Sequence, residues 1–456
     1  MKFKQFYLGC LAHASYYIGS GAEAAIVDPQ RDVGQYLDEA RANNQKIKYV
    51  IETHLHADFV SGHAELARKT GAQIVFGRRA DAQIEHLAAK DGDVLEIGDA
   101  RLKILETPGH TPEGISIVVE NAGEPLRVLT GDTLFIGDVG RPDLAGSKNF
   151  SAAQMAGMLY DSLHEKLLKL PDETEVYPAH GAGSLCGKNM SKETWSTLRE
   201  QRQFNYALQP MSKADFVAMM TENLPEMPAY FSKSVTKNLS GASSLEEIVK
   251  PAQMSPEEVE VFQGVILDVR SAGEYGASHI PNALNIGLGG QFASWAGTLI
   301  EINAPIAIAA ANESEVEEAA LRLARVGHES VKGFILMKDW NLETKEIEQV
   351  PVEAMSELTQ TGKSLQFIDV RRAGEYTDAH APRAINLTLS DLHKLTGELD
   401  KFVPTYVICQ GGYRSSAATS ILERKGFREI YNVSGGTGAW IKAGLETEKE
   451  DAACAV

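Results

Sequence analysis

The segment at residues 53–59, THLHADF, constrains this chain most, because it places two imidazoles and a carboxylate on a tight turn after an apolar strand. Three later segments, 108–111 (PGHT), 130–132 (TGD) and 177–181 (YPAHG), each put another possible ligand after an extended stretch. A single histidine on an apolar strand is more often a hydrogen-bonded core residue. Donors on four such loops are better explained by convergence on a metal ion. The sequence therefore predicts a metal site in the first half of the chain.

The order of these motifs resembles the metallo-β-lactamase superfold, whose hydrolytic members carry His-x-His-x-Asp-His and bind two zinc ions. Phe59 stands here where that pattern has its last histidine, and phenylalanine cannot ligate a metal. The second metal position therefore loses a donor, while the first keeps His54, His110 and Asp132. Two imidazoles and one carboxylate that leave open positions suit non-haem iron(II).

This pattern resembles that of the persulfide dioxygenase family within the superfold. In that family the same three motif positions hold a single iron ion. The resemblance implies His54, His110 and Asp132 as the ligands of one Fe(II) per chain. Zinc is the alternative, because it also accepts histidine and carboxylate donors. Further polar side chains in that family orient the ligands without binding the metal themselves. The corresponding residues are His56, Asp58 and His180.

Two residues near these motifs are candidate substrate contacts. Cys186 lies in the segment 181–188, GAGSLCGK, and we expect its thiol near the mouth of the metal pocket, with either a structural role or a contact to substrate. Arg141, in the segment 140–143 (GRPD), resembles an arginine that borders the iron pocket in the same family. It either steers an anionic substrate or braces its own turn.

Length and composition favour a multidomain soluble protein. A chain of 456 residues predicts about three domains at the usual ~150 residues each. The formal charge is 44 minus 62, or −18, without a basic run, so we expect no nucleic-acid partner. No apolar run of about 18 residues predicts a membrane span, and the N-terminus lacks an export signal, so we expect a cytoplasmic protein.

The four cysteines are far apart, which argues against a disulfide scaffold or a cysteine-based zinc site. They are Cys10, Cys186, Cys409 and Cys454. We expect Cys10 in a core strand and Cys454 in a disordered tail of small residues.

Residues 1 to about 238 alternate short extended runs with helix-like stretches, which suits the αββα sandwich of the superfold. The segment 232–244 is rich in Ser, Lys and Gly, so it predicts a boundary. The expected domains are residues 1–238, 239–350 and 351–456.

An internal repeat occupies the second half of the chain. The segment 267–275, LDVRSAGEY, matches 368–376, IDVRRAGEY, at an offset of 368 minus 267, or 101 residues. Four residues recur at the same offset: His279, Pro281, Ala283 and Asn285 at His380, Pro382, Ala384 and Asn386. This signature resembles the rhodanese family, a small α/β domain with a mainly parallel sheet. In that family its acidic and basic residues mostly form a salt-bridged framework, so we expect structural roles for Asp369, Arg371 and Glu375.

Only the second copy carries a candidate nucleophile. Its apolar strand at 406–408 runs into Cys409, and a helix is expected to about Lys425. A glycine-containing loop at a helix N-terminus points backbone N–H groups inward, which favours a thiolate and a charged persulfide. Arg414 is available to meet an anionic substrate. The remaining loop residues are Gln410, Gly411, Gly412, Tyr413 and Ser415.

The first copy lacks this chemistry. Aligning Gly327 with Gly426 places Ala310 at the position of Cys409 and Glu315 at that of Arg414. A carboxylate in place of the arginine would repel thiosulfate, sulfite or a persulfide anion. We therefore expect this copy to transfer no sulfur and to act as a spacer or docking surface.

The three parts together resemble bacterial fusions of a persulfide dioxygenase with a sulfurtransferase, which act in sulfide detoxification. The expected fold is multidomain α/β and α+β: a metallo-β-lactamase αββα sandwich followed by two rhodanese-like α/β domains. The resemblance implies oxidation of a low-molecular-weight thiol persulfide by O₂ to sulfite and thiol, and transfer of sulfane sulfur between persulfide or thiosulfate and sulfite or thiol through Cys409. The expected partners are these small molecules, within a homo-oligomer.

Two other functions fit parts of the sequence. One is a glyoxalase-II-like zinc thioester hydrolase with accessory rhodanese domains, which needs two metals or a well-placed hydroxide and is disfavoured by Phe59. The other is a non-enzymatic sulfur relay with a structural metal. Closed structural zinc sites are usually rich in sulfur, whereas this cluster consists of His and carboxylate.

Overall fold

The computed structural model describes residues 1–144, 150–222, 224, 227–228, 230–248 and 250–449. Cys454 lies outside these described residues. The chain forms two compact units, of which one takes residues 1–248 with 324–327 and the other takes the remainder.

The first unit contains two six-stranded sheets. The strands of the first sheet are, in spatial order, β1 (Lys2–Leu8), β2 (His13–Ser20), β3 (Glu23–Val27), β4 (Lys46–Ile51), β5 (Gln73–Gly77) and β6 (Leu87–Ala89). Those of the second are β12 (Ser196–Thr197), β11 (Glu175–Pro178), β10 (Arg127–Gly131), β9 (Ile115–Glu120), β8 (Ala100–Glu106) and β7 (Val94–Ile97).

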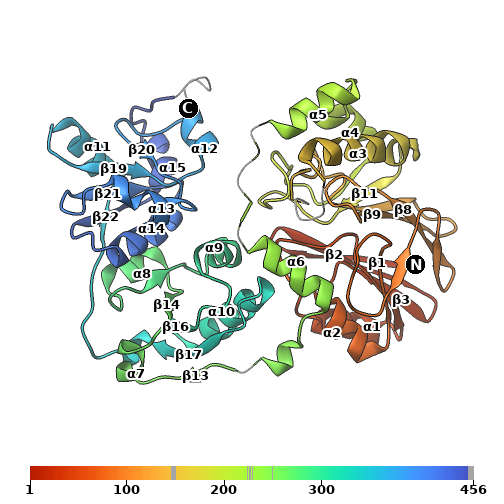
Figure 1. Cartoon of the computed structure of the whole chain (residues 1–456), viewed down its shortest axis with the longest axis horizontal. Coiled ribbons are helices and arrows are strands. Elements are labelled where there is room, and N and C mark those ends of the chain that lie inside the picture. The colour runs from red at the N-terminus through yellow and green to blue at the C-terminus, as the bar shows by residue number, and fades with distance from the viewer. Residues whose placement is uncertain (145–149, 223, 225–226, 229, 249, 450–456) are drawn as a thin grey trace. The chain divides into compact units, whose positions relative to one another are not determined.

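Helices cover the outer face of each sheet (Figure 1). The helices of this unit are α1 (Gly34–Ala42), α2 (His63–Thr70), α3 (Ala152–Glu165), α4 (Leu198–Phe204), α5 (Lys213–Thr221) and α6 (Phe231–Ser240). Tyr36 and Leu66, from α1 and α2, pack with buried residues of the first sheet, and Leu159 and Phe216, from α3 and α5, pack with those of the second. A third apolar cluster joins the facing sides of the two sheets. These four layers confirm the predicted αββα sandwich.

Burial explains the strand sequences. All eight residues of β2 are buried, because one face of its sheet meets the second sheet and the other meets helices. In β8 the buried Ala100, Leu102 and Ile104 alternate with the exposed Arg101 and Lys103. The most apolar strands thus mark the centre of the layered fold.

A helix occupies part of the segment that we expected to be a boundary. Helix α6 spans Phe231–Ser240, and it buries Phe231, Ser234 and Asn238. Its polar composition, with an alternation of Ser and Lys, hides the few positions that face the core. The domain division at 238 and 350 stays a prediction.

The second unit contains two five-stranded sheets with the same strand order. The first sheet has the order β13 (Ala252–Gln253), β17 (Val331–Leu336), β16 (Ile306–Ala310), β14 (Val265–Asp268) and β15 (Leu284–Asn285). The second has the order β18 (Glu348–Val350), β22 (Ile430–Val433), β21 (Thr405–Ile408), β19 (Gln366–Asp369) and β20 (Ile385–Asn386). Every strand pair in both sheets is parallel, as the rhodanese resemblance predicts.

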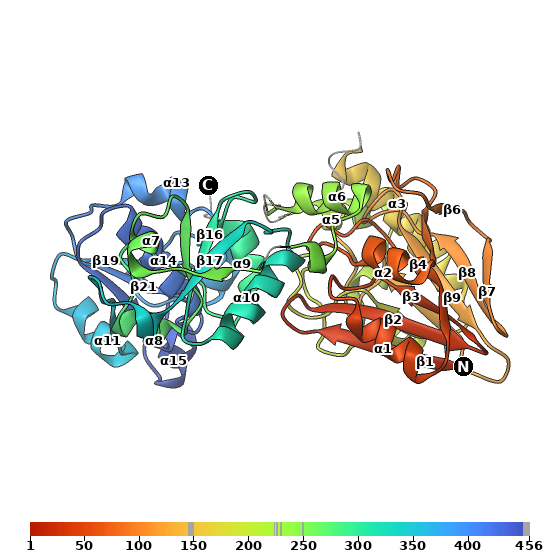
Figure 2. The same ribbon diagram turned by 90° about the horizontal axis from the view of Figure 1, so that it is seen from below.

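The helices of the second unit follow the repeat as well (Figure 2). Those of the first copy are α7 (Pro256–Glu260), α8 (Ala272–Ala277), α9 (Phe292–Leu299) and α10 (Glu313–Arg325). Those of the second copy are α11 (Val352–Gln360), α12 (Ala373–Asp378), α13 (Leu392–Leu395), α14 (Tyr413–Arg424) and α15 (Gly436–Lys442). One buried apolar cluster includes Tyr275 and Ile335 of the first copy and Ile368 and Val407 of the second, so the copies share a core.

The repeated signature forms the same framework in each copy. Arg270 donates to both oxygens of Asp268, and Arg371 does the same to Asp369. Both pairs are buried, and each arginine also reaches a carbonyl oxygen eight residues further along the chain. The structural interpretation of Asp369 and Arg371 agrees with this geometry.

Candidate metal centre and sulfur-transfer loop

The three predicted ligands and His180, which was predicted to orient them, lie on loops that follow four strands of the first unit. His54 comes after β4, His110 lies between β8 and β9, Asp132 directly follows β10, and His180 follows β11. Strand β4 belongs to the first sheet and the others belong to the second, so the site lies where the edges of both sheets meet. All four side chains are buried.

His54, His110 and Asp132 converge as three donors. The distance from Asp132 Oδ2 to His54 Nε2 is 3.6 Å, and that to His110 Nε2 is 3.4 Å. A metal ion with bonds of about 2.1 Å holds adjacent donors roughly 3.0 to 3.6 Å apart. Asp132 Oδ2 is buried and has no hydrogen-bond partner among the described residues. These three donors therefore fit a metal ion.

Neighbouring groups orient the two imidazoles. The Nδ1–H of His110 donates to the carbonyl oxygen of Arg141 at 2.9 Å. His54 Nδ1 lies 2.9 Å from the hydroxyl of Thr53, which in turn donates to Asp28. Both arrangements leave Nε2 with a free lone pair toward the shared centre.

Charge and burial set the protonation of the centre. Burial, with the neighbouring imidazoles, lowers the pKa of His54 well below its ordinary value, and burial also lowers that of His110. Burial alone would raise the pKa of Asp132, but the charges of His180 and the other imidazoles outweigh it and lower that pKa well below its usual range. The donors are thus neutral imidazoles and an ionised carboxylate, which are the forms that bind metals.

His180 links the donor carboxylate to a second one. Its Nδ1 lies 2.7 Å from Asp132 Oδ1, and its Nε2 lies 2.9 Å from Asp58 Oδ2. Burial opposes a charge here, but the two carboxylates outweigh it and raise the pKa of His180 well above its ordinary value. His56 instead turns toward Asp28, with 3.2 Å between Nε2 and Oδ1. These three residues surround the donors, as the resemblance implies.

Phe59 lies where the superfold places a further ligand. Its ring centroid is 4.2 Å from that of His13 and 4.5 Å from that of His56. The ring is almost fully buried and fills this side of the pocket with apolar surface. A second metal ion would meet carbon here in place of a nitrogen donor.

The structure brings Cys186 close to His180, the residue that bonds Asp132. Its sulfur lies within 4.8 Å of ligand atoms of Asp58 and His180. The thiol is buried, and burial together with the charges of Asp58 and Asp132 raises its pKa well above the ordinary value. The predicted position of Cys186 near the metal agrees with this placement.

Arg141 braces the loops around the metal. Its guanidinium pairs with Asp143 at 2.6 and 2.9 Å and donates to the carbonyl oxygen of Leu185. Its backbone N–H bonds the carbonyl oxygen of Cys186, and its own carbonyl orients His110. This buried geometry favours the bracing interpretation of Arg141 over a contact with substrate.

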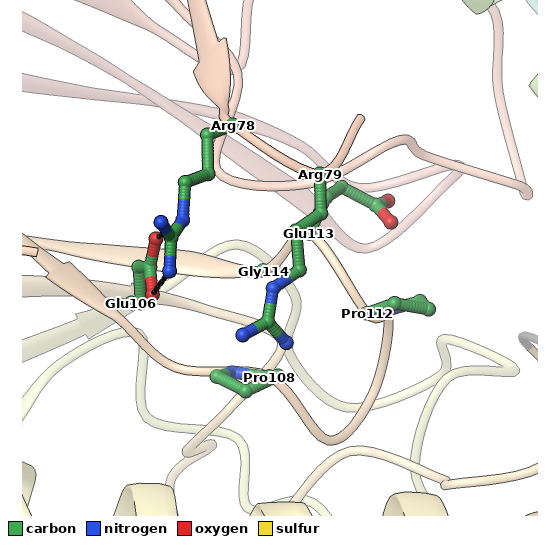
Figure 3. Close-up of a pocket in the computed structure, with 7 residues that line it drawn as sticks. All are labelled: Arg78, Arg79, Glu106, Pro108, Pro112, Glu113 and Gly114. Carbon is green, nitrogen blue, oxygen red and sulfur yellow. Dashed lines mark hydrogen bonds and ion pairs between the residues drawn. The ribbon is translucent and has the colours of Figure 1, made fainter. Parts of the chain in front are cut away.

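Two small hollows flank the loop that carries His110. The metal donors His54, His110 and Asp132 line one of them. Arg78 and Arg79 line the other, where Arg78 pairs with Glu106 (Figure 3). Gly114 borders both hollows, so this loop separates the metal centre from an arginine-lined depression.

The loop at residues 409–415 surrounds the sulfur of Cys409. The backbone N–H of Gly412 donates to Cys409 Sγ at 3.2 Å, and the hydroxyl of Ser415 donates at 3.3 Å. Gly412 adopts a φ of +91°, a conformation that favours glycine. The carbonyl oxygens of Cys409 and Gln410 instead accept bonds from the start of α15. One backbone N–H and one hydroxyl of the loop are thus directed at the sulfur, where the sequence predicted several backbone N–H groups.

Two side chains of this loop have partners that the sequence did not predict. Arg414 forms a two-bond ion pair with Glu375, both at 2.7 Å, so Glu375 orients the loop arginine. Tyr413 was expected to belong to the sulfur cradle. Its side chain leaves the loop, because its hydroxyl donates to the carbonyl of Gly287 in the first copy.

In the equivalent loop of the first copy, a carboxylate of the loop itself accepts the hydrogen bonds. Val269 N–H bonds Ala309 O, and Val370 N–H bonds Ile408 O, so the next residues, Ala310 and Cys409, occupy equivalent positions. The carboxylate of Glu315 accepts from the backbone N–H of Ala311 and from Asn312. In the first copy the loop therefore bonds the carboxylate of Glu315. In the second copy a thiol accepts bonds from one N–H and one hydroxyl of the loop.

Comparisons with known proteins identify the same three parts. The model of the metallo-beta-lactamase superfamily matches residues 8–180, and the model of the rhodanese-like domain matches residues 252–338 and 352–443. The human protein named persulfide dioxygenase ETHE1, mitochondrial, is 32% identical over 223 residues, which are 46% of this chain and 78% of the relative. The chain belongs to the metallo-β-lactamase superfamily.

Two further matches agree with this assignment. A metallo-beta-lactamase of known structure from Staphylococcus aureus subsp. aureus COL is 31% identical with a TM-score of 0.66, covering 74% of this chain and 98% of that one. A hydroxyacylglutathione hydrolase from Polaromonas sp. is 29% identical over 231 residues, which are 45% of this chain and 83% of the relative. The expected metallo-β-lactamase fold followed by two rhodanese-like domains is confirmed, and the fold, the donor cluster and the homology indicate a metal ion.

Three residues that contact the candidate metal centre or its loops were not predicted from the sequence. His13, on β2, is fully buried beside His56 and His180, and neither of its ring nitrogens has a hydrogen-bond partner in the described part of the chain. Asn238, on α6, donates to the carbonyls of His56 and Phe59 and so fixes the first ligand loop. Asp138 accepts from the backbone of Lys188 and Asn189 and holds the loop that carries Cys186. A histidine within an apolar strand was the one available signal.

The structure contains no helix that is both long enough and apolar enough to span a membrane among the residues that were searched, which are the described ones.

Proposed function

We propose that the chain oxidises a low-molecular-weight thiol persulfide with O₂ at an iron(II) centre and transfers sulfane sulfur at Cys409. The first net reaction is RSS⁻ + O₂ + H₂O → RSH + SO₃²⁻ + H⁺. The homology to persulfide dioxygenase ETHE1 and the rhodanese-like domains support an enzyme of this class. Cytoplasmic sulfide detoxification by a homo-oligomer of three-domain chains belongs to the same proposal.

The donor set carries the proposal. His54, His110 and Asp132 offer two neutral nitrogens and one ionised oxygen within 3.4 to 3.6 Å, while Phe59 replaces the ligand that a second metal would need. Two imidazoles and a carboxylate that leave other positions open suit iron(II) in oxygenases. Zinc fits the same donors, so the choice of iron rests on the reaction proposed.

The residues of the chain prepare this centre for an anionic substrate. Iron(II), when bound, supplies the redox chemistry with O₂ that no side chain here can provide. His180 holds Asp132 in place through Oδ1, which leaves Oδ2 for the metal. Cys186 lies beside Asp58 and His180, so its thiol is positioned to contact the sulfur end of a bound persulfide. The buried ring of Phe59 adds an apolar wall beside His56.

The second reaction uses Cys409 as nucleophile. The thiolate attacks the sulfane sulfur of thiosulfate, Cys409 gains that sulfur as a persulfide, and sulfite leaves with the electron pair of the broken S–S bond. The N–H of Gly412 and the hydroxyl of Ser415 stabilise the charge on sulfur. The outer sulfur then passes to sulfite or a thiol, and the direction follows the concentrations of both.

A zinc thioester hydrolase is the second candidate, because the chain is 29% identical to a hydroxyacylglutathione hydrolase. Phe59 argues against it, since a hydrolytic pair of zinc ions needs a donor at that position. Metal analysis together with oxygen uptake on several thiol persulfides separates the two candidates. A protein that contains two zinc ions and hydrolyses thioesters under argon would exclude the dioxygenase.

Two substitutions test whether the two reactions use independent sites. His110→Ala removes a proposed ligand, so it should abolish oxygen uptake and metal retention while sulfur transfer from thiosulfate to cyanide continues. Cys409→Ser should do the reverse. His393→Ala, at an exposed histidine of α13, is the control and should change neither activity. Loss of oxygen uptake in the Cys409→Ser protein would contradict the assignment of independent sites.

A further inference from the structure

Helix α14 starts at the end of the Cys409 loop and presents one face to the first rhodanese-like copy. Its residues with partners in that copy are Tyr413, Ser416, Ser420 and Glu423. Their spacing of three, four and three residues places them on the same side of the helix. The first copy, which lacks a cysteine, therefore contacts the element on which the reactive loop is built.

Tyr413 makes the contact that lies nearest to Cys409. Its hydroxyl donates to the carbonyl oxygen of Gly287 at 2.8 Å, and its ring packs in the apolar core of the first copy. A Cβ at Gly290 would lie 2.7 Å from two atoms of this ring, closer than van der Waals contact permits. The glycine at position 290 thus makes the space in which the Tyr413 ring sits.

Polar bonds continue along the helix. The hydroxyl of Ser416 donates to Asn285 Oδ1 at 2.6 Å, and the backbone N–H of Asn285 donates to Ser420 at 3.1 Å. Glu423 pairs with His279 at 2.9 Å and accepts the backbone N–H of Asn282 at 2.8 Å. Except for Asn282, these residues are buried, and breaking bonds at such positions is costly.

The first copy uses its own signature residues for this purpose. Asn285 and His279 belong to the repeated block, and Asn285 also bonds the carbonyl oxygens of Asp268 and Arg270. The equivalent Asn386 bonds the carbonyls of Asp369 and Arg371 in the same way. His279 and Asn285 therefore connect the first copy to α14, and Asn285 also connects to the loop that follows β14 in its own sheet.

Tyr413 follows Gly412 directly, and the N–H of Gly412 is the backbone donor to Cys409 Sγ. Only the two backbone torsions of Gly412 and one planar peptide unit separate this N–H from the Cα of Tyr413, so a shift of Tyr413 is passed to the donor through a very short segment of chain. Misplacing a catalytic group by about 1 Å costs as much as ~100-fold in rate.

We propose that the first rhodanese-like copy positions the Cys409 loop of the second, with Tyr413 seated against Gly287 and Gly290 as the positioning contact. The first copy, which has Ala310 where the second has Cys409, thus supports the loop that carries the thiol. The inference rests on the proposed sulfur transfer at Cys409, but the reactivity of the thiol tests it separately.

A substitution in the first copy provides the test. Gly290→Ala in the full-length chain adds a methyl group against the Tyr413 ring, so sulfur transfer from thiosulfate to cyanide should fall about tenfold or more. Alkylation of Cys409 by iodoacetamide, followed by mass spectrometry, should slow to a similar extent. Gly289→Ala is the matched control, because a Cβ there meets no atom within 4 Å, and it should change neither rate.

A double-mutant cycle separates positioning from a general loss of structure. In a Tyr413→Ala background the ring is absent, so Gly290→Ala should cost nothing further. Tyr413→Phe, which loses only the bond to Gly287, should lower both rates several-fold while the thermal unfolding temperature stays close to that of the parent. An unchanged rate for Gly290→Ala, or an equal loss in both backgrounds, overturns the proposal. If the parent chain alkylates at Cys409 but transfers no sulfur, the sulfurtransferase assignment fails instead.

Discussion

The two rhodanese-like copies share the same framework residues but differ in the residues of one loop. Both keep the sheet order, the buried pairs Asp268–Arg270 and Asp369–Arg371, and the tyrosine and histidine that stack four residues apart. The difference lies in the few residues after the strand that leads to Ala310 or Cys409. Framework residues determine the fold, and the loop alone decides whether there is a nucleophile.

The two loops also differ in the charged groups that their backbone N–H groups and arginine contact. In the first copy the N–H of Ala311 already bonds the carboxylate of Glu315. In the second copy the N–H of Gly412 is directed at the sulfur, and Arg414 is held by Glu375. A backbone N–H of one loop thus bonds a carboxylate of that loop, whereas a backbone N–H of the other bonds the sulfur of Cys409.

The largest expected effect comes from removing the nucleophile. Cys409→Ser should lower sulfur transfer from thiosulfate to cyanide by about a thousandfold or more, since a serine at this position lacks the nucleophilicity of a thiolate. Ala310→Ser places the same side chain at the equivalent position of the first copy, and it should leave the steady-state rate unchanged. A clear loss of rate in the Ala310→Ser protein would show that the two copies do not differ as described.

An intermediate effect is expected when the first copy is given the missing groups. In a Cys409→Ser background, Ala310→Cys alone should remain inactive, because Glu315 puts a carboxylate where the second copy has Arg414. Adding Glu315→Arg removes that carboxylate and supplies a cation for the anionic substrate, so transfer should rise about tenfold above the single variant. The thiosulfate-to-cyanide assay measures both. Equal rates for the two proteins would mean that Glu315 does not silence this copy.

The smallest effect concerns the pair between Glu375 and Arg414. Burial alone would raise the pKa of Glu375, but the bonds from Arg414 outweigh it and hold the pKa below its ordinary value of 4.5. The ionised form therefore stabilises the fold above pH 4.5, and this contribution is lost as the pH falls through the lowered pKa. Glu375→Gln should lower the thermal unfolding temperature at pH 7 by about 2–4 °C.

The pH dependence of the unfolding temperature shows whether the ion pair causes the difference between the parent and Glu375→Gln. The difference in unfolding temperature between the parent and Glu375→Gln should shrink below pH 4.5, where the parent also loses its charge. Glu274→Gln changes the equivalent residue of the first copy, which bonds Ser271 and pairs with no arginine of a reactive loop. It should leave sulfur transfer unchanged. A difference for Glu375→Gln that persists at low pH would exclude the ion pair as its cause.

Much of the metal centre could be predicted because its residues follow strands. His54, His110 and Asp132 each follow an extended segment, and the loops after these strands meet although the strands belong to two different sheets. Cys186 was expected near them for the same reason, and its sulfur does lie beside His180. The repeat was equally visible, since identical spacing preserves an identical framework.

Other contacts had no signal in the local pattern. Asn238 fixes the first ligand loop from a helix about 180 residues away, in a segment whose polar composition predicted a boundary. His13 lies in a strand where its neighbours suggest only core packing. The side chain of Tyr413 was assigned to its own loop, although it packs in the other copy.

The sequence by itself determined the order of the parts, the candidate metal donors, the phenylalanine at position 59 and the presence of a cysteine in the loop of only one of the two copies, because motifs and spacing are properties of the covalent chain. The tertiary structure alone decided which side chains meet: the direction of Tyr413, the pairing of Arg414 with Glu375, and the bonds from Asn238 to the metal loop. These contacts join residues far apart in the chain, and only the packing of complete elements selects among the many partners that the composition allows.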